Sequence, residues 1–279
     1  MPDSGVRSPE PFDRGARAWA QFMTSPLGQL RVEVALRQLA PHLPRRPLEV
    51  LDVGGGTGET AVRLVREGHE VTVLDSSAAM LALARRHLGS IDPVHRPRLH
   101  FVESALESLP AEWLRSQFAL VVCHCTIEYI ADERPAWPTL FSLLRPGGVL
   151  SLIVPNREAN ALHLAARGLI SRARDALDGG RGEPDLLFNV KRRTYDIARV
   201  KRKLAEVGLE TIVSLGLRVA VDLAPEESIA ADYAAAVAFE VAAGAVPQYL
   251  RAARYLHVIA RRPGGGPPPR KPTQYNVAR

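Results

Sequence analysis

The segment Glu49-Val50-Leu51-Asp52-Val53-Gly54-Gly55-Gly56-Thr57-Gly58-Glu59-Thr60 decides how the rest of the chain is interpreted. An apolar, β-branched run ends in an acid and is followed at once by a glycine-dense turn. Glycines accept positive φ angles and let the backbone approach a ligand closely, and the N-terminus of a following helix favours anionic groups. The segment therefore predicts a strand, a nucleotide-binding turn and a helix, in that order.

The glycines alone leave the nucleotide open. The run 56–61 also satisfies a dinucleotide fingerprint, and Asp75 follows about twenty residues later, where an acid would bind the ribose of NAD. The register of the turn separates the two interpretations, because the turn begins at Gly54 directly after the strand and Asp52 ends the strand beneath it. This register is similar to that of class I methyltransferases, and the resemblance favours S-adenosylmethionine over a nicotinamide or flavin.

The glycine turn resembles the S-adenosylmethionine loop of class I methyltransferases. Two later features agree with the resemblance, namely the turn Leu144-Arg145-Pro146-Gly147-Gly148 before an apolar strand and a last strand at 255–259. The resemblance implies an α/β fold with a Rossmann-like, seven-stranded, doubly wound sheet whose last strand is antiparallel. It also implies S-adenosyl-L-methionine as the cofactor.

The composition is that of a globular chain that needs no cross-links, with 279 residues of which 46% are hydrophobic. Cys123 and Cys125 lie too close together in a strand-like segment for an easy disulfide. Residues 1–10 contain no secretory pattern, and acids interrupt the alanine-rich run 230–246 that comes nearest to a membrane span. We expect a cytoplasmic protein with reduced thiols, no membrane association and no metal.

Alternating strand and helix patterns predict five parts along the chain. Residues 1–33 form an N-terminal segment and a helix over the cofactor cleft, and 34–155 form the cofactor-binding core, whose first two strands are expected at 49–53 and 70–75. Residues 156–195 are a helical lid inserted near the acceptor, and 196–262 complete the sheet with a strand region at 210–222 and a helix at 227–243. Residues 263–279 are a disordered basic tail.

Acids after the second and third strands are the first candidates for cofactor contacts. Asp75, at the carboxyl end of a strand, can accept both ribose hydroxyls, although it can alternatively cap the next helix. Asp52 can orient loop amides or the methionine ammonium, or be structural. Leu106 and Glu107 suit the adenine ring and its amine, with a solvated acidic turn as the alternative.

The segment Cys123-His124-Cys125-Thr126-Ile127-Glu128-Tyr129 follows the fourth strand, at the edge where ligands bind in such sheets. Adjacent residues of an extended segment alternate faces and no second ligand pair occurs, so a metal site is disfavoured. His124 can face the cofactor, and Glu128 and Tyr129 can line the acceptor pocket. A packed, satisfied histidine is the alternative.

Within this class, the chain resembles the bacterial tRNA carboxymethoxyuridine methyltransferases over about residues 12 to 263. The telling pieces are Gly28-Gln29-Leu30-Arg31 and 254–261, Arg-Tyr-Leu-His-Val-Ile-Ala-Arg. The resemblance implies cofactor contacts from a set of residues that includes the loop: Arg31, Asp52, Gly54, Gly55, Gly56, Gly58, Asp75, Leu106, Glu107 and His124. The basic run 191–193 departs from the family's lysine-rich segment.

The methyl acceptor is the open question. A carboxylate is ionised at neutral pH and needs no general base, so an arginine would hold it, with Arg157 and Arg218 as candidates. A phenol or amine would favour His124 or Glu128 as base. The acceptor is tRNA or a small biosynthetic metabolite; basic residues at 191–203 favour RNA. A non-catalytic scaffold of the same fold is the third hypothesis.

Overall fold

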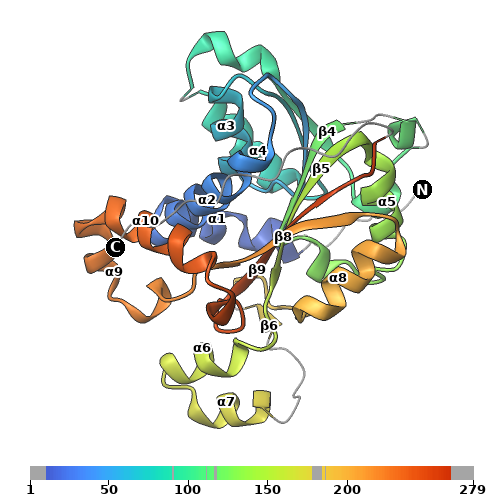
Figure 1. Cartoon of the computed structure of the whole chain (residues 1–279). Coiled ribbons are helices and arrows are strands. Elements are labelled where there is room, and N and C mark those ends of the chain that lie inside the picture. Colours follow the sequence, from blue (N-terminus) through green and yellow to red (C-terminus); the bar gives the residue numbers. More distant parts are fainter. Residues whose placement is uncertain are drawn as a thin grey trace, which may run out of the picture.

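The computed structural model describes residues 11–89, 91–110, 112–115, 118–177, 184–185 and 187–264. Most of the predicted basic tail and the glycine-rich run 178–183 lie outside the described residues. Figure 1 shows a central twisted sheet with helices on both sides. Among the described residues, no helix combines the length and the apolar character that a bilayer span requires.

The sheet has seven strands in the order β3-β2-β1-β4-β5-β9-β8. Strand β9 runs antiparallel to both β5 and β8, whereas the other neighbouring pairs are parallel. This confirms the predicted fold class. The strands are β1 (Glu49–Val53), β2 (Glu70–Asp75), β3 (Leu99–Glu103), β4 (Phe118–His124), β5 (Leu144–Pro155), β8 (Glu210–Leu217) and β9 (Tyr255–Arg261).

Alternate residues of each strand pack on opposite faces of the sheet, as the period of two requires. One face carries Leu51 and Val121 against α5 (Ala136–Leu143) and α8 (Ile197–Glu206). The other carries Val50 and Leu120 against α2 and α3. The helices on this side are α1 (Pro11–Thr24), α2 (Pro26–Leu39), α3 (Glu59–Arg66), α4 (Ala78–Leu88), α9 (Glu226–Ala231) and α10 (Tyr233–Gly244). Each fully buried aliphatic side chain stabilises the fold by roughly 1.5–3 kcal/mol.

Two short helices stand apart from these layers. Helices α6 (Asn160–Ala166) and α7 (Ile170–Leu177) project beyond one end of the sheet in Figure 1. A two-stranded ribbon, β6 (Pro184–Asp185) and β7 (Val190–Lys191), follows them. These elements fall within the segment predicted as a lid, and that role stays a prediction.

Several element boundaries differ from the sequence-based expectation. Helix α1 was not predicted as a separate element. The single helix expected at 227–243 is broken, because Asp232 adopts φ −135° and ψ 58° and its side chain caps α10. The strand expected at 210–222 ends at Leu217, since Arg218 takes a positive φ of 58°.

Candidate active site

A cavity of about 240 Å³ opens at the carboxyl edge of β1, β2 and β4, under α1 and α2. It brings together most of the residues that the sequence analysis selected. Those that line it are Arg31, Asp52, Gly54, Gly55, Gly56, Asp75, Leu106, Glu107, His124 and Tyr129. Gly58, Glu128 and Arg218 are not among the lining residues.

The glycine turn is shaped by close packing rather than by free backbone donors. A Cβ atom on Gly54, whose φ is 64°, would lie 2.3 Å from Oγ1 of Thr126. The N–H of Gly54 donates to the Leu74 carbonyl at 2.7 Å, and that of Gly56 donates to Asp75 at 2.8 Å. The amides at 54 and 56 are therefore satisfied inside the protein, and the glycines serve to bring the bare backbone to the cavity wall. Gly58 lies outside the wall as the left-handed N-cap of α3, with φ 84°.

Asp75 connects the turn to the start of α4. Its Oδ2 accepts from the Gly56 N–H, and its Oδ1 accepts from the Ser77 N–H at 2.9 Å. The helix itself is capped by Ser77, whose Oγ accepts from the Met80 N–H. Burial raises the pKa of Asp75, and the two backbone hydrogen bonds oppose that shift. The carboxylate lines the cavity at the place expected for a ribose partner.

Asp52 is 2% exposed, and its buried Oδ2 accepts no hydrogen bond from any described residue. Burial, together with the nearby Asp75 and Glu59 carboxylates, raises the pKa of Asp52 to about 7. An orphaned carboxyl oxygen in a cavity wall is costly unless a ligand donates to it. The ammonium group of a methionine moiety supplies both the donor and the opposite charge, so Asp52 fits the cofactor.

Arg31 is a buried cation held by neutral groups. Its guanidinium donates to the sulfur atoms of Cys125 and Met23 at 3.7 and 3.5 Å and lies 4.8 Å from the centre of the Trp19 ring. Among the residues that the structure describes, no carboxylate forms an ion pair with Arg31. A buried guanidinium without an anion is a binding site for one, and a forked contact suits the methionine carboxylate.

An aromatic cluster that the sequence analysis missed covers the cavity. Phe12 and Trp19 of α1 meet Phe188, with ring centroids 4.9 and 5.8 Å apart, and Phe12 also meets Tyr129 at 5.2 Å. All four rings line the cavity. The signal was the helical spacing of Phe12, Ala16, Trp19 and Met23, which Gly15 and three nearby arginines obscured.

Arg218 lies one layer behind the wall. It donates to Asp222 from Nε at 2.9 Å, and Asp222 also pairs with Arg254 at 3.4 Å. Both guanidinium groups lie close to the Tyr255 ring, at 5.8 and 5.9 Å from its centre, and Tyr255 does line the cavity. Burial opposes ionisation of the Tyr255 phenol, yet Arg254 and Arg218 lower its pKa below the usual value.

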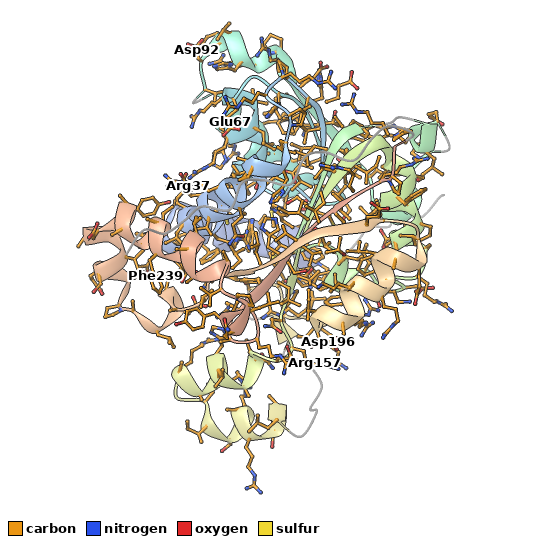
Figure 2. All side chains as sticks on the ribbon, viewed as in Figure 1. Arg37, Glu67, Asp92, Arg157, Asp196 and Phe239 are labelled. Atoms are coloured by element: carbon orange, nitrogen blue, oxygen red, sulfur yellow. The ribbon has the colours of Figure 1, made fainter. Side chains whose placement is uncertain are left out.

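The remaining candidates are used elsewhere or lie deeper. Arg157 pairs with Asp196, as Figure 2 shows, and its side chain is 60% exposed. Glu128 is 1% exposed behind the wall, in a short 3-10 turn. Cys123 and Cys125 are free cysteines, and burial raises the pKa of both thiols. Arg192 lines the cavity, whereas the sequence analysis gave it a role only as one of the basic residues that favour RNA.

The amino-acid sequence is similar to those of known methyltransferases. A model of the methyltransferase domain matches residues 51–150. The tRNA 5-carboxymethoxyuridine methyltransferase of Escherichia coli (strain K12) is 31% identical over 249 residues, covering 85% of this chain and 89% of that protein. Trans-aconitate 2-methyltransferase of Deinococcus radiodurans is 34% identical over 130 residues, 46% of each chain.

A solved structure shares the architecture. The S-adenosylmethionine dependent methyltransferase from Mesorhizobium loti superposes with a TM-score of 0.53 at 19% identity, covering 82% of this chain and 98% of that one. The identity is too low to carry more than the fold. The extended match to the tRNA enzyme and the domain match over the glycine turn carry the assignment: the chain belongs to the S-adenosylmethionine-dependent methyltransferases.

Proposed function

We propose that this methyltransferase esterifies a carboxylate, and that the carboxylate belongs to a modified tRNA nucleoside. The proposal rests on the acceptor side of the cavity, where Arg192 and Tyr255 line the wall and Arg218 and Arg254 stand behind Tyr255. Their combined effect is seen in the pKa of Tyr255, which is lowered despite burial. Such a positive wall favours an anionic acceptor over an amine.

The cofactor side has a complementary set of groups. In this proposal Arg31 holds the methionine carboxylate, Asp52 the ammonium and Asp75 the ribose hydroxyls. Leu106 and Glu107 contact the adenine, and all five residues line the cavity. When bound, S-adenosylmethionine supplies a methyl group on a positively charged sulfur. The residues of the chain fix its orientation, which matters because well-aligned reactants gain an effective molarity of roughly 10⁵–10⁸ M.

Methylation of a carboxylate requires little acid–base catalysis from the protein. One carboxylate oxygen forms the new bond to the methyl carbon while the carbon–sulfur bond breaks and its electron pair stays on sulfur. The acceptor carries no proton at neutral pH, so neither His124 nor Glu128 has one to remove. Arg192 orients the carboxylate, and the aromatic cover of Phe12, Trp19 and Phe188 excludes water.

The tRNA component is supported by the similarity to the Escherichia coli enzyme and by charge near the cavity. Arg192 lies between Lys191, which is exposed, and Arg193, which donates to the backbone carbonyls of Ile130 and Ala131. Lys201 and Arg202 on α8 are also exposed. Arg192 lines the cavity, and the exposed cations at 191, 201 and 202 are available to the phosphate groups of an RNA.

The experiment uses S-adenosylmethionine labelled on the methyl group, with bulk tRNA and, separately, a small-metabolite extract. We expect label in the tRNA, and its release as methanol by mild alkali, because an ester hydrolyses and an N-methyl or ether group does not. Label confined to the low-mass fraction would overturn the tRNA acceptor in favour of a small metabolite. Alkali-stable label would overturn the carboxylate.

A matched pair of variants tests the acceptor wall. Arg192→Gln removes a lining cation, and Lys191→Gln removes its exposed neighbour. We expect Arg192→Gln to lower kcat/KM for the acceptor by about tenfold to a hundredfold, the worth of one charge-assisted hydrogen bond, with cofactor affinity unchanged. Lys191→Gln should leave kcat within about threefold.

A further inference from the structure

A chain of buried hydrogen bonds runs from His124 on β4 along the face of the sheet that α2 covers, as far as the edge strand β8. His124 Nε2 lies 2.8 Å from Ser151 Oγ, which lies 2.9 Å from His257 Nε2. His257 Nδ1 lies 2.8 Å from Gln38 Oε1, and Gln38 Nε2 donates to the Gly216 carbonyl at 2.8 Å. Ser151 and His257 are fully buried, and Gln38 is 4% exposed. The chain joins β4, β5, β9, α2 and β8.

The Gly216 end of this hydrogen-bond chain fixes which atom donates in each of its hydrogen bonds. The Gly216 carbonyl only accepts, so the Gln38 amide nitrogen faces it and the Gln38 oxygen faces His257. His257 must therefore carry its proton on Nδ1. Burial, helped by His42, lowers the pKa of His257 to about 3, so the ring is neutral and its Nε2 is a bare lone pair.

The tautomer of His257 fixes the hydrogen bonds of Ser151 and of His124 at the cavity. Ser151 donates its hydroxyl proton to His257 Nε2, which leaves the Ser151 oxygen to accept from His124. His124 is neutral as well, since burial, His257 and Arg31 all lower its pKa. A neutral ring that donates from Nε2 has no proton on Nδ1. His124 lines the cavity, and Nδ1 is the ring nitrogen that remains for a ligand.

We propose that Gln38, His257 and Ser151 are positioning residues, which hold His124 as the Nε2–H tautomer so that it presents a hydrogen-bond acceptor, and not a donor, to the cavity. With the reverse tautomer of His257, its bare Nδ1 would face the Gln38 oxygen, and two acceptors would meet without a proton between them. With the reverse tautomer of His124, its bare Nε2 would face the Ser151 oxygen, whose proton is already donated to His257. The inference holds for any methyl acceptor.

This arrangement has a use beside a sulfonium cofactor. The unprotonated side of an imidazole carries the negative end of its dipole, which stabilises a nearby positive charge, whereas an N–H would repel it. The tautomer therefore favours the positively charged S-adenosylmethionine over its neutral product, S-adenosylhomocysteine. The positioning chain then contributes to product release as well as to cofactor binding.

Nitrogen NMR of the imidazole rings tests the proposal directly, because protonated and unprotonated ring nitrogens have well-separated shifts. With ¹⁵N-histidine protein at pH 7, and the His124 signals identified by their loss in His124→Gln, we expect Nε2 protonated and Nδ1 bare. A protonated Nδ1, or two protonated nitrogens, in the wild-type protein would overturn the proposal without any variant.

Ser151→Ala removes the acceptor of the His124 N–H and should move the proton to Nδ1, because a buried N–H without a partner is unfavourable. Ser214→Ala is the matched control, since Ser214 Oγ is a buried hydroxyl on strand β8 that takes no part in the hydrogen-bond chain from His124 to Gly216. The control should keep the wild-type tautomer. Retention of the wild-type tautomer in a folded Ser151→Ala protein would contradict the proposal. Ser151→Thr keeps a hydroxyl at this position and should therefore keep the wild-type tautomer of His124.

Calorimetry gives the second readout. We expect Ser151→Ala to weaken S-adenosylmethionine binding about threefold to tenfold more than S-adenosylhomocysteine binding, because only the former is charged at sulfur. Ser214→Ala should leave the ratio of the two Kd values unchanged. Equal losses for both ligands would contradict the electrostatic role of the tautomer.

Discussion

Asp52 is a buried residue whose titration makes the stability of the fold depend on pH. Its Oδ2 lies in a cavity wall where no described residue donates a hydrogen bond to it, and its pKa rises from the usual value of 3.8 to about 7. The folded chain therefore holds a proton that the unfolded chain releases between these two values. The free energy of unfolding therefore falls as the pH rises from 3.8 to about 7, and it does not recover above that pH.

Asp52→Asn should remove this loss. We expect the variant to gain stability relative to the wild-type protein as the pH rises from 4 to 7, by a few kcal/mol, since one pKa unit corresponds to about 1.4 kcal/mol. Urea unfolding across that range measures the difference. Glu49→Gln, at the exposed start of the same strand, should give a flat difference, and a flat difference for Asp52→Asn would contradict the raised pKa.

Individual site residues differ in how far the sequence could reveal them. Asp75 and the glycine turn follow from a local pattern, because the strand, turn and helix are contiguous. Among the described residues, Asp52 Oδ2 has no donor and Arg31 has no carboxylate partner, and both features depend on burial, which sequence spacing does not report. Arg218 was selected as a substrate partner, but in the structure it forms an ion pair with Asp222. Arg218 itself adopts a positive φ, which its residue type does not predict.

At the scale of elements, α1 is tied to the cofactor site by one carboxylate. Asp13 Oδ1 accepts from the Ser77 hydroxyl at 2.6 Å and from the Ala79 N–H at 3.2 Å, which joins α1 to the N-terminus of α4. The same helix supplies Phe12 and Trp19 to the aromatic cover. Opening of α1 would expose the cavity, and we expect this contact to limit that opening.

Asp13→Ala should loosen α1. We expect backbone amides of 11–24 to exchange at least tenfold faster in hydrogen–deuterium exchange, and bound S-adenosylmethionine to dissociate faster, because two hydrogen bonds to a charged group are lost. Asp92→Ala removes a comparable cap, on Val94 N–H, in a different part of the molecule and should leave α1 unaffected. Unchanged exchange in α1 after Asp13→Ala would show that packing alone holds the helix.

The strands were easier to predict than the helices. Buried parallel strands are continuous apolar runs, and β1 and β2 occupy the predicted residues. The helix break at Asp232 has no glycine or proline to signal it. After the break, α10 carries Glu240, whose fully buried carboxylate accepts from the N–H groups of Val219, Ala220 and Val221. These hydrogen bonds connect α10 to the turn after β8, and no local sequence pattern indicates them.

At the scale of the molecule, the cofactor side of the site was predictable and the acceptor side was not. The cofactor residues come from loops after successive strands, in an order that the fold class dictates. The acceptor wall combines Arg192 and Tyr255, and the hydrogen-bond chain combines Gln38 with His257, 219 positions away. Contacts across such separations follow from sheet order and packing, which one sequence does not display.

Exposed charge is spread unevenly around the sheet. Helix α8 carries exposed Lys201 and Arg202, whereas α9, on the opposite side in Figure 1, begins with exposed Glu226 and Glu227. A basic side next to the lid segment suits a polyanion that reaches the cavity from there. If tRNA is the acceptor, these cations lie within the footprint of the RNA.

The salt dependence of binding tests this orientation. Each phosphate contact contributes roughly 0.7–0.9 to the slope of log K against log salt concentration. We expect Lys201→Glu with Arg202→Glu to lower tRNA affinity at low salt and to reduce the slope by about one to two. Arg45→Glu with Arg46→Glu alters two exposed arginines before β1, at the end of the sheet away from the cavity, and should leave the slope unchanged. Equal slopes for both double variants would place the RNA elsewhere, because counterion release reports only the cations that the phosphates replace.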